Sequence, residues 1–137
     1  MLPLVLSLFL VATPVHAEEL KPPVHVEAAH TPPIEVLIKI TPQYREQQVA
    51  LAFADTPRMV SVARCESRFH QFNSDGTPLH SKTDDWGLLQ IHGTWIPLSK
   101  KMGLDIKHSA EDNIEFAKYI LKTQGIKAWS CSRKAAV

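Results

Sequence analysis

The stretch SAEDNIEFAKYILKTQG, residues 109–125, decides the fold class of this chain. Ser109 can cap the first turn of a helix, and Gly125 can end the last one. The acidic residues Glu111 and Asp112 place negative charge at the positive end of such a helix. The apolar residues recur at the spacing of one buried helix face; they are Ile114, Ala117, Tyr119, Ile120 and Leu121. We therefore predict an amphipathic helix over residues 110–124.

Two more helices are expected before this one. Residues 43–53 mix apolar with polar positions in a pattern typical of a partly buried helix. Thr56 followed by Pro57 is typical of an N-cap and a first helical residue, so a second helix is expected over residues 57–66. Its inward positions are Met59, Val60, Val62 and Ala63.

The segment between these helices and residues 110–124 is polar and rich in turn-forming residues. Residues 73–85 contain an Asp-Gly pair and are expected to form a loop that lines a cleft. Residues 94–102 predict a short helix, provided that Pro97 lies in its first turn. We find no alternating strand pattern in residues 43–137, so the fold class is predicted to be mainly α.

Length and composition exclude several classes of protein. The chain has 137 residues, which suits a single domain, and its 45% hydrophobic and 21% charged residues are typical of a globular protein. The formal net charge of +1 is too balanced for a protein that tracks phosphates, so nucleic acid is not an expected partner.

The N-terminal part divides into two segments. Residues 1–17 hold a short, uncharged apolar run that Pro14 interrupts, which predicts a secretory signal peptide; an uncleaved membrane tether is the alternative. Residues 18–42 carry five prolines and predict a stiff spacer, although residues 34–40 also suit a short strand. Residues 43–137 then form the folded domain.

The chain holds two cysteines, Cys65 and Cys131. Because exported proteins mature in oxidising compartments, we expect the two to form a disulfide. The bridge would place residues 128–130 beside Glu66. The alternative is a pair of reduced cysteines in the core.

Glu66 is the strongest candidate for a catalytic group. It lies near the end of the predicted helix 57–66 with apolar neighbours. Burial there would raise the pKa of its carboxyl and let it act as a general acid, which glycosidic cleavage requires. The alternative is a surface glutamate paired with Arg64 or Arg68.

A set of short motifs resembles one known family. The motifs are ARCESRF at 63–69, DWGLLQI at 85–91, Thr94-Trp95, Asn113-Ile114, Gly125 and Trp129. Their types and order, over about residues 55–131, resemble the SLT-type lytic transglycosylase domain of the lysozyme-like superfamily. The Cys-Glu-Ser triplet followed by a late cysteine is also similar to the resuscitation-promoting-factor branch of that superfamily.

The resemblance implies a small lysozyme-like helical domain with a sugar-binding cleft, acting on peptidoglycan outside the cytoplasm. Glu66 would protonate the glycosidic oxygen that leaves N-acetylmuramic acid, and the sugar's own 6-hydroxyl would then close a 1,6-anhydro ring. A lysozyme-like hydrolase remains an alternative, for which Asp75, Asp84 and Asp85 offer a second carboxylate. A catalytically silent glycan-binding module is the alternative from another class.

The family pattern also suggests residues that contact the substrate. Gln90, with the backbone around Leu89 and Ile91, would contact the sugar's N-acetyl and hydroxyl groups. Ser67 would support the position of Glu66. Tyr119 would reach the cleft with its hydroxyl or pack in the core.

The chain departs from the family pattern in two places. The family carries an A-Y-N-A-G segment where this chain reads GIKAWSC at residues 125–131, so no tyrosine after Tyr119 can take the equivalent position. The loop over residues 73–86 is longer and more charged than in the family. Trp86 and Trp95 either stack on sugar rings or belong to the core.

No cofactor is expected. The histidines lack the paired spacing of a zinc site, and the chain has no glycine-rich phosphate loop. We expect a monomer whose partners are peptidoglycan glycan strands, located in the periplasm, the cell envelope or the extracellular space.

Overall fold

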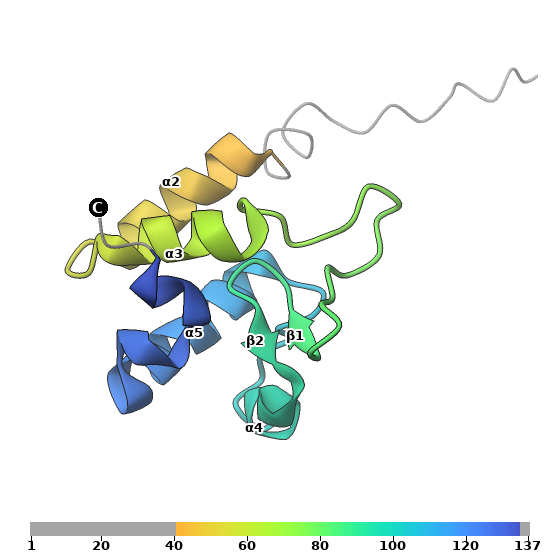
Figure 1. Cartoon of the computed structure of the whole chain (residues 1–137). Coiled ribbons are helices and arrows are strands. Elements are labelled where there is room, and N and C mark those ends of the chain that lie inside the picture. Colours follow the sequence, from red (N-terminus) through yellow and green to blue (C-terminus); the bar gives the residue numbers. More distant parts are fainter. Residues whose placement is uncertain (1–40, 135–137) are drawn as a thin grey trace, which may run out of the picture. The chain divides into compact units, whose positions relative to one another are not determined.

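The computed structural model describes residues 41–134, which fall within one compact unit. The predicted signal peptide, residues 1–17, and nearly all of the predicted spacer, residues 18–42, lie outside the described residues. The described part is built mainly from helices, which confirms the predicted fold class (Figure 1). Within it, no helix has both the length and the apolar character needed to cross a membrane.

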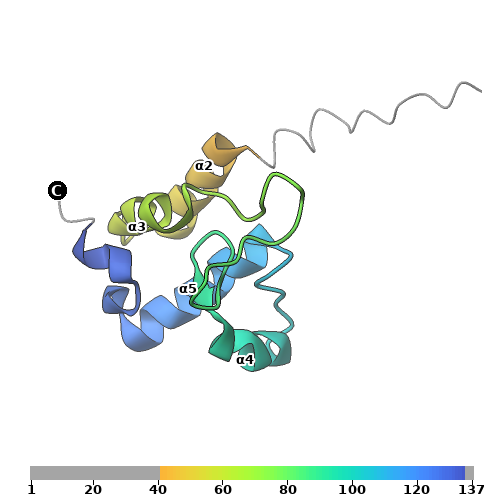
Figure 2. The same ribbon diagram turned by 45° about the vertical axis from the view of Figure 1, so that its right-hand side comes forward.

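The first two described helices, α2 (Pro42–Ala52) and α3 (Arg58–Ser67), pack against each other (Figures 1 and 2). α2 begins one residue earlier than predicted, because the side chain of Thr41 caps it by accepting a hydrogen bond from the Tyr44 amide. α3 begins one residue later than predicted, because Pro57 is its N-cap rather than its first residue.

The chain between α3 and α5 contains a small antiparallel sheet. β1 (Asp85–Trp86) pairs with β2 (Ile91–His92), and Trp86 lies opposite Ile91. The expectation of no strand is wrong for these four residues, since a tight turn rather than side-chain alternation brings their backbones together. The loop before β1 turns at Gly76, whose φ of +82° lies in the left-handed region that glycine adopts readily.

Helical structure resumes after the sheet. The 3₁₀ turn η1 (Gly93–Trp95) leads into α4 (Ile96–Lys101), whose first turn contains Pro97, as predicted. α5 (Ala110–Gln124) begins and ends as predicted, and the Ser109 side chain accepts a hydrogen bond from the Asp112 amide. Two 3₁₀ turns, η2 (Ile126–Ala128) and η3 (Ser130–Arg133), complete the described chain.

The buried face of α5 differs from the predicted stripe in at least three positions. Ile114, Ala117 and Ile120 are buried, but Tyr119 and Leu121 are only half-buried at the edge of the core. Phe116, which the prediction left out, is fully buried. The face is therefore rotated slightly from the one expected.

Loop residues contribute as much to the core as the helices do. Leu88 and Leu89 are 0% exposed and Ile91 is 1% exposed, although all three belong to or flank a turn. This anchoring fixes the backbone on both sides of Gln90 within the core. It also fixes the turn at residues 87–90, which joins β1 to β2.

Candidate functional site

Glu66 is placed by the packing of α3. Buried Met59, Val62 and Ala63 set the rotation of the helix against the core. The helix stops one residue after Glu66, at Ser67, because Arg68 adopts a left-handed conformation with φ of 55°. The Glu66 carboxyl thus lies in the last turn, half-buried, near the sheet and the C-terminal turns.

The surroundings of Glu66 raise the pKa of its carboxyl above the ordinary glutamate value of 4.5. Burial is the largest cause, and the negative charge of Asp85 acts in the same direction. The Cys131 amide, which donates a hydrogen bond to Glu66 Oε1 at 3.1 Å, opposes the rise, as do the Ser130 hydroxyl and the Lys134 charge. The net result is a carboxyl that keeps its proton to higher pH than an exposed glutamate.

The two cysteines form the predicted disulfide, Cys65–Cys131, with a Cα–Cα separation of 5.9 Å. The bridge joins the residue before Glu66 to the turn η3, which packs on α3. We call residues 129–134 the C-terminal hook. Its amide at Cys131 and its Ser130 side chain contact Glu66, so of the residues 128–130 predicted to lie beside Glu66 the structure shows this contact for Ser130.

Two further hydrogen bonds hold the C-terminal hook. The indole Nε1 of buried Trp129 donates to the Leu89 carbonyl at 2.8 Å. The Arg58 guanidinium, at the start of α3, donates to the Ser132 carbonyl at 2.5 Å. The hook is therefore attached both to the turn of the small sheet and to both ends of α3.

The three aspartates considered as partners for Glu66 lie in different surroundings. Asp75 is exposed and accepts hydrogen bonds from the Thr77 amide and hydroxyl, which lower the pKa of its carboxyl. Asp84 accepts a hydrogen bond from the Trp86 indole at 2.8 Å. Of the three, Asp85 is the one whose charge acts on Glu66.

Asp85 is held in place by hydroxyl groups of its own loop. Its Oδ2 accepts hydrogen bonds from the hydroxyls of Ser81, at 2.8 Å, and Thr83. These two hydrogen bonds fix the orientation of the carboxyl group. The loop thus supplies a second carboxyl group, from β1, to the neighbourhood of the Glu66 carboxyl at the end of α3.

Gln90 lines a small cavity of about 80 Å³ together with Asp85; Glu66 is not among the residues that line it. Its backbone is left-handed, with φ of 45°, and its side-chain amide donates to the Gly87 carbonyl at 2.8 Å. The described residues that share this cavity come from β1, β2, η1, α5 and the C-terminal turns; they are Asp85, Ile91, His92, Trp95, Ile120, Gln124, Ala128 and Trp129. The structure therefore brings the predicted residues Gln90 and Ile91 together with Asp85, the neighbour of Glu66.

The backbone near Gln90 is already engaged in part. The Leu89 amide donates to Asn113 and its carbonyl accepts from Trp129, so neither is free for a sugar in this conformation. The Ile91 side chain belongs to the core, and its backbone is paired with Trp86 in the small sheet, so it is not free for a sugar in this conformation either. Ser67 donates its hydroxyl to the Leu88 carbonyl at 2.6 Å and so connects the end of α3 to the turn that carries Gln90.

The aromatic candidates take different places. The Trp86 ring is stacked on His80 with centroids 4.0 Å apart, and Lys107 Nζ lies 3.6 Å from its centroid. Trp86 therefore cannot stack on a sugar without displacing one of them. Trp95 packs edge-to-face on Tyr119 and also lines the 80 Å³ cavity, whereas Tyr119 is not among the residues lining that cavity.

Two buried amide side chains, Gln71 and Asn113, hold the turn at residues 87–90. This role was not predicted for either residue. Gln71 accepts from the Leu88 amide and donates to the carbonyls of Ile106 and Lys107. Asn113 accepts from the Leu89 amide and donates to the carbonyls of Trp86 and Ile106. Asn113 belongs to the Asn113-Ile114 motif, but no pattern in the sequence indicates that Gln71 is buried.

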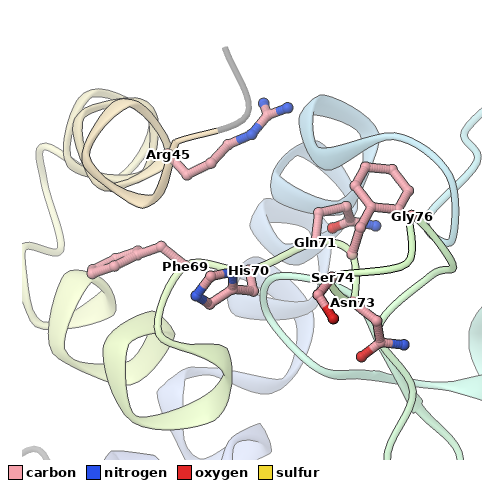
Figure 3. A pocket seen from close by; sticks show the side chains of 8 residues that line it. Arg45, Phe69, His70, Gln71, Asn73, Ser74 and Gly76 are labelled. Carbon is pink, nitrogen blue, oxygen red and sulfur yellow. The ribbon is translucent and has the colours of Figure 1, made fainter. Parts of the chain in front are cut away.

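A larger cavity of about 450 Å³ lies elsewhere (Figure 3). It is lined by Arg45 of α2 and by residues after α3; these are Phe69, His70, Gln71, Phe72, Asn73, Ser74 and Gly76. None of the predicted site residues lines it. The described residues also contain no cluster of His, Cys, Asp or Glu side chains able to hold a metal ion.

Comparison with known proteins adds no relative. No family model matches the chain, and no curated protein or solved structure matches it either.

Proposed function

We propose that this protein is an exported enzyme that cleaves the glycosidic bond between N-acetylmuramic acid and N-acetylglucosamine in peptidoglycan, as a lytic transglycosylase with Glu66 as its acid. One observation carries the proposal. The Glu66 carboxyl has a raised pKa, because it is half-buried and faces the charge of Asp85. A glycosidase acid must keep its proton to higher pH than an exposed glutamate, and Asp85, whose charge helps to raise the pKa of Glu66, lines a cavity that polar and aromatic side chains share.

Glu66 acts twice in the proposed reaction. Its proton moves to the glycosidic oxygen as the bond to the anomeric carbon breaks, which leaves the carboxylate charged. The sugar's 6-hydroxyl then attacks the anomeric carbon, and the carboxylate takes up the hydroxyl proton. Glu66 returns to its starting state, no water is consumed, and the product carries a 1,6-anhydro ring. Because the nucleophile belongs to the substrate, proximity supplies much of the rate.

The position of Asp85 also favours a second candidate, a lysozyme-like hydrolase. Its charge acts on Glu66, and its carboxylate is held by the hydroxyls of Ser81 and Thr83. In a hydrolase such a carboxylate would activate a water molecule or stabilise the developing positive charge on the sugar. The two candidates share Glu66 and differ in whether Asp85 is required.

The test is mass spectrometry of the soluble products released from insoluble peptidoglycan by the purified chain. We expect 1,6-anhydro muropeptides, one water lighter than reducing-end products. Glu66→Gln, which keeps the size of the side chain, should lower their formation by about 10²–10⁴-fold. Glu115→Gln is the control, because Glu115 is exposed on α5 and pairs with Lys118 on the surface.

Asp85→Asn separates the two enzyme classes. Anhydro products that persist in this variant support transglycosylation, whereas reducing-end products that disappear in it identify the hydrolase. A chain that binds the polymer and releases nothing is a glycan-binding module. Equal turnover by the Glu66→Gln variant and the unchanged chain would refute the role of Glu66.

A further inference from the structure

The C-terminal hook supplies every group that stabilises the charged form of Glu66. These groups are the Cys131 amide, the Ser130 hydroxyl and the charge of Lys134. The influences in the opposite direction are burial and the charge of Asp85 from β1. Because η3 packs on α3, the hook also contributes to the burial of the last turn of that helix. Both the hydrogen bond to Glu66 and part of its shielding from water therefore depend on one short segment.

The disulfide is the attachment nearest to Glu66. Cys65 precedes Glu66 in the chain, and Cys131 is the residue whose amide contacts the carboxyl. The other two attachments involve residues that are more distant from Glu66 along the chain. Arg58, which donates to the Ser132 carbonyl, is eight residues before Glu66. Trp129 donates a hydrogen bond to Leu89, in the turn between β1 and β2. The disulfide is covalent and joins Cys131, which makes the contact, to Cys65, the neighbour of Glu66. It therefore fixes the geometry of the contact more closely than the hydrogen bonds of Arg58 and Trp129 do.

We propose that Cys131 is a positioning residue for Glu66: its disulfide to Cys65 holds the Cys131 amide against the carboxyl, and bond cleavage depends on the oxidised pair. The activity part of this proposal rests on the proposed function. The structural part does not, because the protonation of Glu66 can be measured directly.

Opening the bridge needs a reductant, and a dithiol supplies it by thiol–disulfide exchange. The dithiol is oxidised to its own disulfide and gives two electrons and two protons, which leave Cys65 and Cys131 as free thiols. The hook can then move away from α3, and water reaches Glu66. Since burial is the largest cause of the raised pKa, we expect the pKa of Glu66 to fall toward its ordinary value in the reduced chain. More of the acid is then charged at neutral pH, and less can donate a proton.

The experiment follows Glu66 by carbon NMR of its carboxyl during a pH titration of the full chain, oxidised and in excess dithiothreitol. Product formation from peptidoglycan is measured over the same pH range. In the reduced chain we expect both midpoints to move to lower pH and the rate at pH 7 to fall about tenfold or more. The double variant Cys65→Ser/Cys131→Ser should reproduce the reduced chain without dithiothreitol.

The control is Val49→Ala, which removes methyl groups from the core on α2 and leaves the bridge intact. It lowers stability without touching the hook, so its titration of Glu66 and its pH–rate profile should equal those of the unchanged chain. A reduced chain that keeps its helical circular dichroism and an unmoved or higher Glu66 midpoint would overturn the proposal.

Two further outcomes are also decided. If the reduced chain unfolds, Arg58→Met is used instead, because it removes another attachment of the hook and keeps the disulfide. An unchanged Glu66 titration in that variant supports the bridge as the positioning element, and a moved one refutes it. If the oxidised chain releases no products, the proposed function fails, while the NMR titration still tests the position of Cys131.

Discussion

Replacing Asn113 by alanine should destabilise this protein more than any exposed substitution on the same helix. Asn113 is 0% exposed and makes three hydrogen bonds, to the Leu89 amide at 2.8 Å and to the carbonyls of Trp86 and Ile106 at 3.0 and 2.9 Å. The Ile106 carbonyl keeps a second donor, Gln71. The Leu89 amide and the Trp86 carbonyl lose the partner that Asn113 provides.

The expected magnitude follows mainly from the Leu89 amide, because the Trp86 carbonyl stays paired with Ile91 in the small sheet. A buried polar group without a partner costs about 1–3 kcal/mol. We therefore expect Asn113→Ala to lower the free energy of unfolding by about 2 kcal/mol. For a domain of this size that corresponds to a fall in Tm of about 8 °C or more.

Urea unfolding of the oxidised full chain, followed by far-UV circular dichroism, measures this loss. Glu115→Ala is the control on α5, since its pair with Lys118 is exposed and should contribute less than about 0.5 kcal/mol. A loss below about 1 kcal/mol in Asn113→Ala, with an unchanged slope against urea, would mean that the buried amide does not hold the turn at residues 87–90.

Two more predictions concern the same turn and its acid. Gly87→Ala should lower the free energy of unfolding by at least about 2 kcal/mol, because a Cβ there would lie 2.5 Å from Asn113 Nδ2 and Gln71 Oε1. Gly103 also has a positive φ but lies in open space, so Gly103→Ala should lower it by only about 1 kcal/mol. Urea unfolding measures both losses. Glu66→Gln should gain stability relative to the unchanged chain as pH rises: a raised pKa means that the protonated carboxyl favours the folded state, and this contribution is lost above the folded pKa. Melting curves between pH 4 and pH 8 measure the difference, and a gap that stays constant with pH would contradict it.

The parts of the fold that were predictable are those whose signals are local. The limits of α5 follow from Ser109 and Gly125, and the position of Pro97 in α4 follows from its missing amide hydrogen. The disulfide was predictable because a chain with two cysteines has only one intramolecular pairing available. In each case the decisive information lies within one turn of helix or in a count of one residue type.

The turn that carries Gln90 was not predictable in the same way. Its form depends on Gln71 and Asn113, which accept hydrogen bonds from the backbone amides of Leu88 and Leu89. Gln71 is 17 residues away from Leu88 along the chain, and Asn113 is 24 residues away from Leu89. Glutamine and asparagine are usually exposed, and nothing in the neighbouring sequence distinguishes a buried one. The strands β1 and β2 were not predictable for a different reason: each has only two residues, which is too short to show an alternating pattern.

The state of Glu66 depends on a balance that only the assembled fold defines. The C-terminal hook brings a backbone amide and a positive charge, which favour the carboxylate, while the enclosure of the last turn of α3 favours the neutral acid. Burial is the largest cause, and together with the charge of Asp85 it outweighs the Cys131 amide, the Ser130 hydroxyl and the charge of Lys134, so the pKa of Glu66 is raised. The Asp85 carboxyl is itself held in place by the hydroxyls of Ser81 and Thr83. A carboxyl with a raised pKa can thus be maintained at the end of a helix by two segments with opposed effects, and the disulfide between Cys65 and Cys131 keeps one of them in place.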